Sequence, residues 1–321
     1  MQNKTTAIRI GDLGESVAAV PVLLGFHPAR SLTVLLLTKR QVALTVRTDL
    51  PPATESAQRY AGQLVDSLTA RGGVDADRAV LIVVDQQRHA DLVTHVAQAL
   101  ARLGITVNST MWAEGTRAGQ RWACIDGCHH GVVPGTTPLQ VAYAVEGRAV
   151  LPNREAVAAS LAPAVDEPIM RTRAVVVAFA MADPDAQRFV TPQVMYDALG
   201  EWREGRLVFD DARVTLLAFA LTDRKIRDHV VTWTIRDWVD DVHTFWMALV
   251  RQIPAPFVAE PAVLLALTAL VKGDGVLADA ALHIAETSRP GHALVRLIRA
   301  MQESNLGPSQ VRSTLERVTA T

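Results

Sequence analysis

The sequence is poor in the residues that mark several classes of protein. Aromatic residues make up 5% of the 321 residues, and 32 Lys and Arg residues are balanced by 33 Asp and Glu residues, for a net charge of −1. A chain without a basic excess has no general attraction for nucleic acid or anionic membranes, and few aromatic side chains are available to stack on bases. We therefore expect neither nucleic acid nor a membrane as a partner.

Cysteine and long apolar runs are also scarce. The two cysteines are too few for a disulfide framework, and the longest apolar stretches, such as AVLLALTALV, stop after ten residues, short of the roughly 18 that a membrane span needs. The segment MQNKTTAIRIGD lacks the apolar core of a secretory signal. These features predict a cytoplasmic protein, and the 49% of hydrophobic residues predicts a large buried core.

The first half of the sequence alternates between strand and helix patterns. Two amphipathic segments read as helices, one over 54–72 with Thr54 as its cap and Gly72 as its end, the other over 91–104 with Gly104 as its end. This order predicts an α/β domain over 1–151, with a mixed, partly parallel sheet flanked by helices. The β-rich runs are 32–37, 42–46, 79–84, 105–107 and 121–125.

After the punctuation AVLPNRE at 149–155, helical patterns dominate and predict an all-α domain over 152–321. The nine apolar residues of 174–182 fit a strand or a buried helix equally well. A helical apolar stripe runs through 226–253 and ends at IPAP. Four helix patterns with short links follow, an arrangement similar to that of proteins with paired, repeat-like helices, although no fixed period is present.

The stretch GFHPARS, residues 25–31, is explained first as a junction between helix and strand. Asp12 and Glu15 are spaced as a capping box for a preceding helix, and Gly25 suits the left-handed position that closes one. Pro28 cannot continue the helix, and Ser31 would open the strand. The alternative is that His27 or Ser31 contacts a ligand at the edge of the sheet.

Polar residues follow two of the predicted strands. Asp85 and Gln86 come directly after 79–84, and Asn108 comes directly after 105–107. In open parallel sheets ligands bind beyond the carboxyl ends of strands, whereas Asp and Asn also cap helices and form turns there. The candidate ligand-pocket residues are therefore His27, Ser31, Asp85 and Asn108. The sequence contains no nucleophile elbow, glycine-rich phosphate loop or HExxH motif, so no catalytic residue is assigned.

The stretch CIDGCHH contains the zinc-ligand residue types Cys124, Cys128, His129 and His130. The C-x3-C spacing is looser than the common C-x2-C, and no second Cys pair exists, so we expect no required structural metal and no cofactor. Zinc binding, a facultative disulfide and a simple turn with incidental thiols remain the three alternatives.

Several stretches are similar to one family. PVLLGFHPARSLTVLLL resembles the signature of an actinobacterial family known as domain of unknown function 4192, in which a proline and two leucines precede G-F-H-P, two variable residues and S-L. The resemblance covers nearly the whole chain and implies an α/β part followed by a helical part, with no established activity and no catalytic residue. Ala123 stands where members carry a second aromatic residue. The other matching stretches are RW at 121–122, GRAVLPNRE, IRD at 226–228, IPAPF, LLAL, KGDGVLADAAL and NLGP.

These observations favour an interaction or regulatory protein without catalytic activity, in which the helical part binds an unknown protein partner. The first alternative is an enzyme or small-ligand sensor that uses a pocket at the strand ends. The second alternative is a nucleic-acid-associated protein with a local basic patch around Arg296, Arg299 and Arg312. Convergence of the four candidate pocket residues in one concave site would favour the first alternative.

Overall fold

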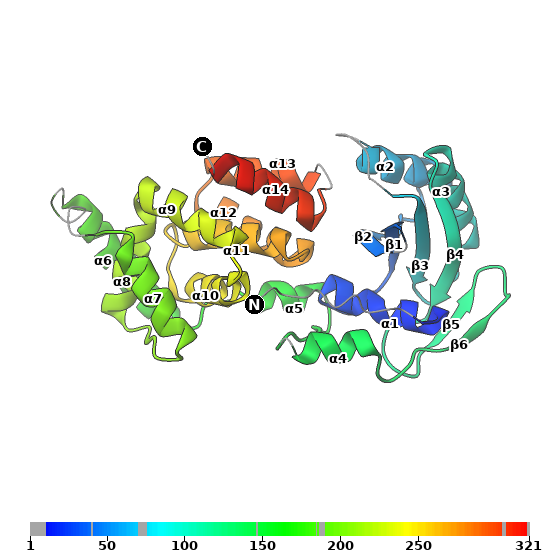
Figure 1. The fold of residues 1–321 in the computed structure, drawn as a ribbon, viewed down its shortest axis with the longest axis horizontal. Helices are drawn as coiled ribbons and strands as arrows, with labels where there is room; N and C mark the ends of the chain where they lie inside the picture. Colours follow the sequence, from blue (N-terminus) through cyan, green and yellow to red (C-terminus); the bar gives the residue numbers. More distant parts are fainter. Residues whose placement is uncertain are drawn as a thin grey trace. The chain divides into compact units, whose positions relative to one another are not determined.

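The structure is a computed structural model, and it describes residues 11–39, 41–69, 76–145, 147–183, 185, 190–303 and 306–319. The chain divides into two compact units, Met1–Ala156 and Val157–Thr321 (Figure 1). The first unit is built on a sheet and the second consists of helices, so the predicted order of an α/β part and an all-α part is confirmed. The sequence-based division after residue 151 into two domains stays a prediction.

A six-stranded mixed sheet forms the centre of the first unit, with the strand order β2-β1-β3-β4-β5-β6. β3 and β4 are parallel, and every other neighbouring pair in this sheet is antiparallel. A helical crossover is needed only between the two parallel strands, and α3 supplies it. The strands are β1 Ser31–Thr38, β2 Gln41–Asp49, β3 Arg78–Val84, β4 Thr106–Ala113, β5 Arg121–Cys124 and β6 His130–Val132.

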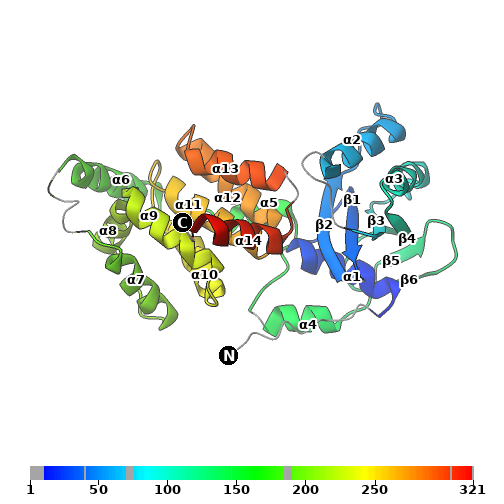
Figure 2. The same cartoon turned by 45° about the horizontal axis from the view of Figure 1, so that its top comes forward.

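Helices cover both faces of this sheet. Leu32, Val34 and Leu36 of β1 point to one face, where they share a core with α2 (Ala57–Thr69) and α3 (Ala90–Arg102). Thr33 and Leu35 point to the other face and are also buried. The helices α1 (Leu13–Leu24) and α4 (Pro138–Val145) contact each other on the side away from α2 and α3 (Figures 1 and 2). Burial on both faces explains why β1 and β3 are apolar almost without interruption.

The GFHPARS stretch forms the predicted junction. The side chain of Asp12 accepts a hydrogen bond of 2.7 Å from the backbone N–H of Glu15 and caps α1, which continues through Pro21. Gly25 ends the helix with φ 78°, a left-handed conformation that glycine adopts without steric cost. β1 then begins at Ser31. The predicted cap, glycine stop and strand start are all confirmed.

The junction is bonded to the far end of the same unit. Phe26 forms an isolated parallel β-bridge with Leu151, and Phe26 is buried. The backbone N–H of Leu151 donates to the carbonyl of Gly25 at 2.8 Å, and the N–H of His27 donates to the carbonyl of Leu151 at 3.0 Å. The first and last parts of the unit are therefore joined by two backbone hydrogen bonds.

Two predicted details of the flanking helices are wrong. α2 begins at Ala57. Its first turn is capped by Ser56 and not by Thr54, since the hydroxyl of Ser56 accepts a hydrogen bond of 3.3 Å from the backbone N–H of Arg59. The end predicted at Gly72 lies outside the described residues. Leu103 is 39% exposed and follows α3 instead of continuing its apolar stripe, because the helix already ends and Gly104 adopts φ 79°.

The second unit is an array of helices, and α5 (Arg154–Ala159) runs across the division between the units. No helix among the described residues has both the length and the apolar character needed to span a bilayer. The elements are α6 Glu167–Ala182, α7 Gln193–Arg203, α8 Asp211–Thr222, α9 Arg224–Val231, the 3-10 helix η2 Thr232–Ile235, α10 Val239–Gln252, α11 Ala259–Val271, α12 Gly275–Ser288, α13 Ala293–Glu303 and α14 Pro308–Thr319.

The core of the second unit surrounds α11, which is buried over almost its whole length and contacts α8, α10, α12, α13 and α14 (Figure 1). A helix that is apolar on every side requires such neighbours. Beside it, the rings of Trp233 and Trp246 stack at 5.8 Å, and both side chains are fully buried. These tryptophans therefore belong to the core, as the apolar stripe predicted for Trp246.

The structure resolves the ambiguous segment 174–182, which is the second half of the helix α6. The prediction of one helical stripe over 226–253 is wrong, because the structure divides this segment between α9, η2 and α10. The break lies at Arg236, whose backbone is extended with φ −85° and ψ 162°. The tighter turn of η2 before this break brings Trp233 against Trp246, which one continuous helix would hold more than three turns apart.

Candidate functional site

The carboxyl ends of the parallel strands meet the start of β1 at one edge of the sheet. Val84 pairs with Ala113 of β4 and with Ser31 of β1, so the segments after β3, after β4 and before β1 are neighbours. This edge is where an open parallel sheet usually binds ligands. His27, Ser31 and Asp85 all belong to these segments, so three of the four predicted pocket residues lie at one edge.

His27 is held by a residue that the sequence analysis did not identify. Its Nδ1 lies 2.8 Å from the hydroxyl of Thr116, in the segment after β4, and Thr116 is buried. Burial, and then the positive charge of Arg117, lower the pKa of His27 below its ordinary value. The ring is therefore neutral at neutral pH. The stretch EGTR after β4 is the sequence signal for Thr116.

Asp85 is engaged with His89 and not with His27. The Nε2 of His89 lies 2.6 Å from a carboxylate oxygen of Asp85, and the indole N–H of Trp112 donates to the Asp85 carbonyl at 2.8 Å. Burial alone would raise the pKa of Asp85, but hydrogen bonds from His89 and from nearby backbone N–H groups outweigh it and lower the pKa. The carboxylate therefore stays ionised and orients the loop that begins α3.

The expectation that Asn108 follows a strand is wrong. β4 extends over Thr106–Ala113, and Asn108 is the extra residue of a bulge near its beginning, since Val107 pairs with Ala79 while Ser109 pairs with Val80. At about 3.3 Å per residue, the five positions from Asn108 to Ala113 place it about 16 Å from the strand-end edge. The four predicted residues therefore do not converge, and their ligand role stays a prediction.

Ser31 is buried at this edge, and its hydroxyl has no hydrogen-bond partner among the described residues. Two nearby residues other than glycine adopt left-handed backbone conformations, Arg30 with φ 45° and His89 with φ 49°. Such conformations cost of the order of 1 kcal/mol each and gather at functional sites. The backbone of this edge is thus strained. Its polar side chains form two separate pairs, His27 with Thr116 and Asp85 with His89.

The loop between β5 and β6 brings three of the four predicted metal-ligand residues together. The Sγ atoms of Cys124 and Cys128 and a ring nitrogen of His129 all lie within 4.8 Å of one another. Both cysteines are free thiols, with Cys124 buried and Cys128 exposed. Hydrogen bonds to Asp126 and Cys124 raise the pKa of the Cys128 thiol to about 12, so in the absence of a cation it is a proton donor.

A buried polar cluster in the second unit was also missed. The carboxylate of Glu260, which is 1% exposed, lies 3.3 Å from Arg227, 2.7 Å from Arg289 and 3.2 Å from the Nε2 of His292. A lone Glu at the start of the apolar run AEPAVLLALTALV was the signal for it. Because the single carboxylate of Glu260 is contacted from α9 and from the α12–α13 connection, the cluster ties both of these segments to α11.

One of the three basic residues considered for nucleic acid is neutralised in the structure. Arg299 forms ion pairs with Glu286 and Asp279, and Arg312 donates to the carbonyl of Ile235 at 2.9 Å. Within the part of the chain that the structure describes, Arg296 is the one of the three whose guanidinium has neither an ion pair nor a hydrogen bond. A binding role for this patch stays a prediction.

The feature least explained by packing is the outer face of α6, which we define as Thr172, Val175, Val176, Phe179 and Ala182. The inner side of the helix is anchored by Arg173 and Val177, which are buried. On the outer face Val175 is 65% exposed and Phe179 is 80% exposed. α6 is therefore apolar on both sides but covered on one, which explains why its sequence showed no helical period.

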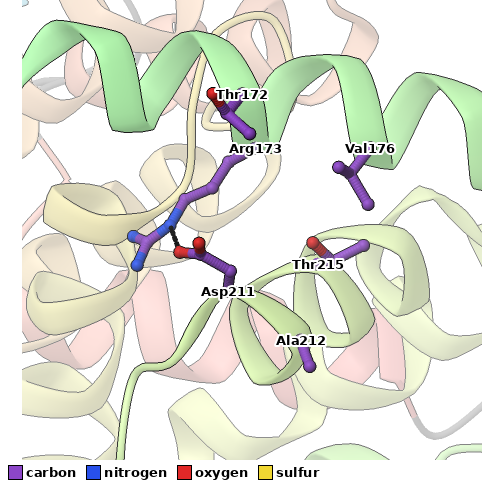
Figure 3. Close-up of a pocket in the computed structure, with 6 residues that line it drawn as sticks. All are labelled: Thr172, Arg173, Val176, Asp211, Ala212 and Thr215. Carbon is purple, nitrogen blue, oxygen red and sulfur yellow. Dashed lines mark hydrogen bonds and ion pairs between the residues drawn. The ribbon is translucent and has the colours of Figure 1, made fainter.

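Arg173 fastens α6 to the rest of the unit. Its Nε donates to a carboxylate oxygen of Asp211 at 2.7 Å (Figure 3). Its Nη atoms donate to the carbonyls of Gln252 and Phe209 at 3.0 and 3.2 Å. Arg173 is not among the residues predicted from the sequence, although an Arg directly before the apolar run AVVVAFAMA is a signal for a buried, paired charge.

A pocket of about 200 Å³ opens beside Arg173, between α6 and the start of α8 (Figure 3). Thr172 and Val176 of the outer face form one wall, and Ala212 and Thr215 of α8 form the other. The walls are mostly apolar. The outer face of α6 thus carries the exposed ring of Phe179 and, next to it, an apolar pocket.

Comparison with known proteins agrees with the resemblance seen in the sequence. No match was found among curated proteins or among solved structures. The sequence does match the family described as Domain of unknown function (DUF4192) over residues 14–309, which includes the GFHPARS junction, the strand-end edge, the Cys/His loop and α6. The chain therefore belongs to the DUF4192 family.

Proposed function

We propose that this protein is a non-catalytic interaction protein of the cytoplasm whose helical part docks through the outer face of α6, and that the first partner of this face is a second copy of the chain. The observation that supports the proposal is the exposure of Val175, Val176 and Phe179, at 65%, 46% and 80%, on one stripe of a single helix. A contiguous exposed apolar stripe is typical of an interaction site.

The outer face is complementary to itself in shape. Phe179 protrudes, and the pocket begins at Thr172 and Val176, about five residues back along the same helix. At 1.5 Å per residue this is a separation of about 8 Å. If two copies of α6 pack antiparallel with their two-fold axis near Val177, each Phe179 lies opposite Val175 of the other copy and points at that copy's pocket.

The same arrangement is complementary in charge. A two-fold axis near Val177 places Arg171 of one helix opposite Asp183 of the other, because the two positions are equally far from the axis. Arg171 is 72% exposed and already pairs with Glu167 of its own helix. The contact with Asp183 of the second copy would add one ion pair at each end, which selects the antiparallel orientation more than it adds affinity.

The expected strength follows from the buried area. Burial of a phenylalanine side chain contributes about 2 kcal/mol, and an isologous dimer buries two copies of Phe179. Loss of both aromatic rings should therefore weaken dimerisation by about 4 kcal/mol, a roughly thousand-fold change in the dissociation constant. One helix and the flank of α8 make an interface of small size, so we expect a dissociation constant in the micromolar range.

The test is the oligomeric state of the full chain, measured by analytical ultracentrifugation over a range of concentrations. The wild type should dimerise, and Phe179→Ser should be monomeric at the same concentrations. The matched control is Val145→Ser, because Val145 is 82% exposed on a helix of the other unit. Equal effects of the two substitutions, or a wild type that stays monomeric at every concentration, would refute the proposal.

A second variant separates specific docking from general stickiness. Ala212→Leu fills the pocket while leaving Phe179 intact, and it should also prevent dimerisation. An equimolar mixture of Phe179→Ser and Ala212→Leu retains one complete pair of ring and pocket, so it should recover part of the dimer. If the wild type stays monomeric but binds an amphipathic helical peptide from another protein, the face is a docking site with a different occupant and the self-association is wrong.

The alternative of an enzyme or small-ligand sensor keeps one favourable observation, which is the strain at the strand-end edge. Arg30→Gly should relieve the left-handed backbone and raise stability. If a small molecule raises the melting temperature of the wild type and Arg30→Gly abolishes that rise while stabilising the free protein, the strained edge binds a ligand. A stabilised variant with an unchanged ligand response would count against this alternative.

A further inference from the structure

The Cys/His loop between β5 and β6 has a geometry that the sequence did not predict. The hairpin closes with a hydrogen bond of 2.8 Å from the N–H of Cys124 to the carbonyl of His129. Inside it, the N–H of Gly127 donates to the carbonyl of Cys124 at 3.0 Å, and Gly127 adopts φ 78°. This left-handed turn bends the chain back, so that Cys128 and His129 both lie against Cys124.

The three side chains already have nearly the spacing of metal ligands. The two Sγ atoms and the ring nitrogen lie within 4.8 Å of one another, and the Nδ1 of His129 is 3.1 Å from the Sγ of Cys128. Around a tetrahedral Zn²⁺ ion, with Zn–S bonds of about 2.3 Å and Zn–N bonds of about 2.0 Å, ligand atoms lie about 3.5 to 3.8 Å apart. Side-chain rotations that move the ligand atoms of Cys128 and His129 by about 1 Å would therefore complete the site.

We propose that Cys124, Cys128 and His129 bind one divalent transition-metal ion, of which Zn²⁺ fits best, with the fourth coordination position open to solvent. Two thiolates and an imidazole are the donor set that zinc prefers, whereas the hard ions Mg²⁺ and Ca²⁺ prefer oxygen ligands. Cys124 is 3% exposed and anchors the site, while Cys128 and His129 are exposed and give the ion access.

The other histidine of the motif is excluded by strand alternation. His130 pairs with Ala123 across the hairpin, and residues directly opposite each other share a face of the sheet. Ala123 and Cys124 are consecutive in β5 and point to opposite faces. His130 therefore points away from the side that carries Cys124. As a neighbour of the proposed ligand His129 that cannot reach the ion, His130 is a control residue for the test below.

The ion is not needed to form the hairpin, since β5 and β6 are already joined by backbone pairing and by the indole N–H of Trp122, which donates to the carbonyl of Val132 at 3.1 Å. The expectation that no structural metal is required stays a prediction. Binding would instead hold the loop in one conformation and protect both thiols from oxidation. Each thiolate that binds must first release its proton, so metal uptake and proton release are coupled.

The test is calorimetric titration of Zn²⁺ into the reduced, metal-free full chain. We expect one ion per chain, with proton release that is revealed by repeating the titration in buffers of different ionisation enthalpy. Co²⁺ should give the thiolate charge-transfer and visible bands of a tetrahedral site. Cys128→Ser and His129→Asn should each weaken binding at least about tenfold, since even the loss of an outer-shell partner costs that much.

His130→Asn is the matched control and should bind as the wild type does. Equal weakening by His129→Asn and His130→Asn would overturn the ligand set. The absence of a one-to-one titration in the folded wild type, or Zn²⁺ that leaves the rate of alkylation of Cys128 unchanged, would overturn the site. Formation of a Cys124–Cys128 disulfide in air at the same rate with and without Zn²⁺ would show that the loop is a thiol pair and not a metal site.

Discussion

Replacement of Arg173 by alanine should loosen α6 from the second unit. The guanidinium is 3% exposed and donates to Asp211 and to the carbonyls of Gln252 and Phe209, so it joins α6 to the start of α8 and the end of α10. The carboxylate of Asp211 is 66% exposed and can be hydrated after the substitution, so the loss of its ion pair with Arg173 costs little free energy. The two carbonyls are part-buried and lose a charged donor.

The magnitude follows from those two acceptors. A buried polar group left without a partner costs about 1 to 3 kcal/mol, and partial exposure favours the lower half of that range. With the packing of the aliphatic stem added, Arg173→Ala should reduce the free energy of unfolding of the second unit by about 3 kcal/mol. Arg171→Ala is the control. Its ion pair with Glu167 is exposed at both ends, so the cost should stay below about 0.5 kcal/mol.

The assay is urea denaturation followed by tryptophan fluorescence. Four of the six tryptophans, Trp202, Trp233, Trp238 and Trp246, lie in the second unit, so the signal is dominated by its unfolding. A two-unit chain need not unfold in one step, and the transition of the second unit is identified by the loss of its stacked indoles. A cost for Arg173→Ala equal to that of Arg171→Ala would refute the reasoning, since buried donors and exposed ones would then contribute alike.

The remaining predictions concern the first unit and its boundary. Gly25→Val should cost about 1 to 2 kcal/mol in urea denaturation because φ is 78°, whereas Gly62→Ala in α2, with open space around its Cβ, should be neutral or slightly stabilising. The lowered pKa of His27 means that the folded state resists protonation, so stability is complete above about pH 6.5 and falls as the pH drops below it. His27→Gln should flatten that fall in thermal melts at a series of pH values, and an unchanged slope would contradict this. Limited proteolysis should cut first near residue 152 and leave two resistant fragments; a first cut inside α6 would contradict that boundary.

The sequence was sufficient wherever the determining interactions are local. The cap of Asp12, the left-handed Gly25 and the strand start at Ser31 depend on a few neighbouring residues, and all three were predicted. Asn108 was misplaced because a bulge is set by pairing with β3, which local composition does not reveal. The strand ITV is recognisable from the sequence, but the six further residues of β4, 108–113, are not.

The candidate sites were harder to predict because they depend on contacts between distant segments. Thr116 meets His27 across 89 residues, and Arg173 meets Gln252 across 79. The metal-ligand residues were recognised from their types, yet the spacing alone did not show that Gly127 bends the loop enough to bring them together. The apolar outer face of α6 was visible as a run without period, but the side left uncovered was known only from the structure.

The β-bridge between Phe26 and Leu151 has a consequence for how the chain folds. About 125 residues separate its two sides, so forming the bridge carries the entropy cost of closing a long loop. During synthesis α1 and β1 leave the ribosome before Leu151 does, so the Gly25 carbonyl and the His27 N–H must wait for Leu151 to form these two hydrogen bonds. The GFHPARS junction therefore cannot acquire all of its final backbone hydrogen bonds until the segment around Leu151 has been synthesised.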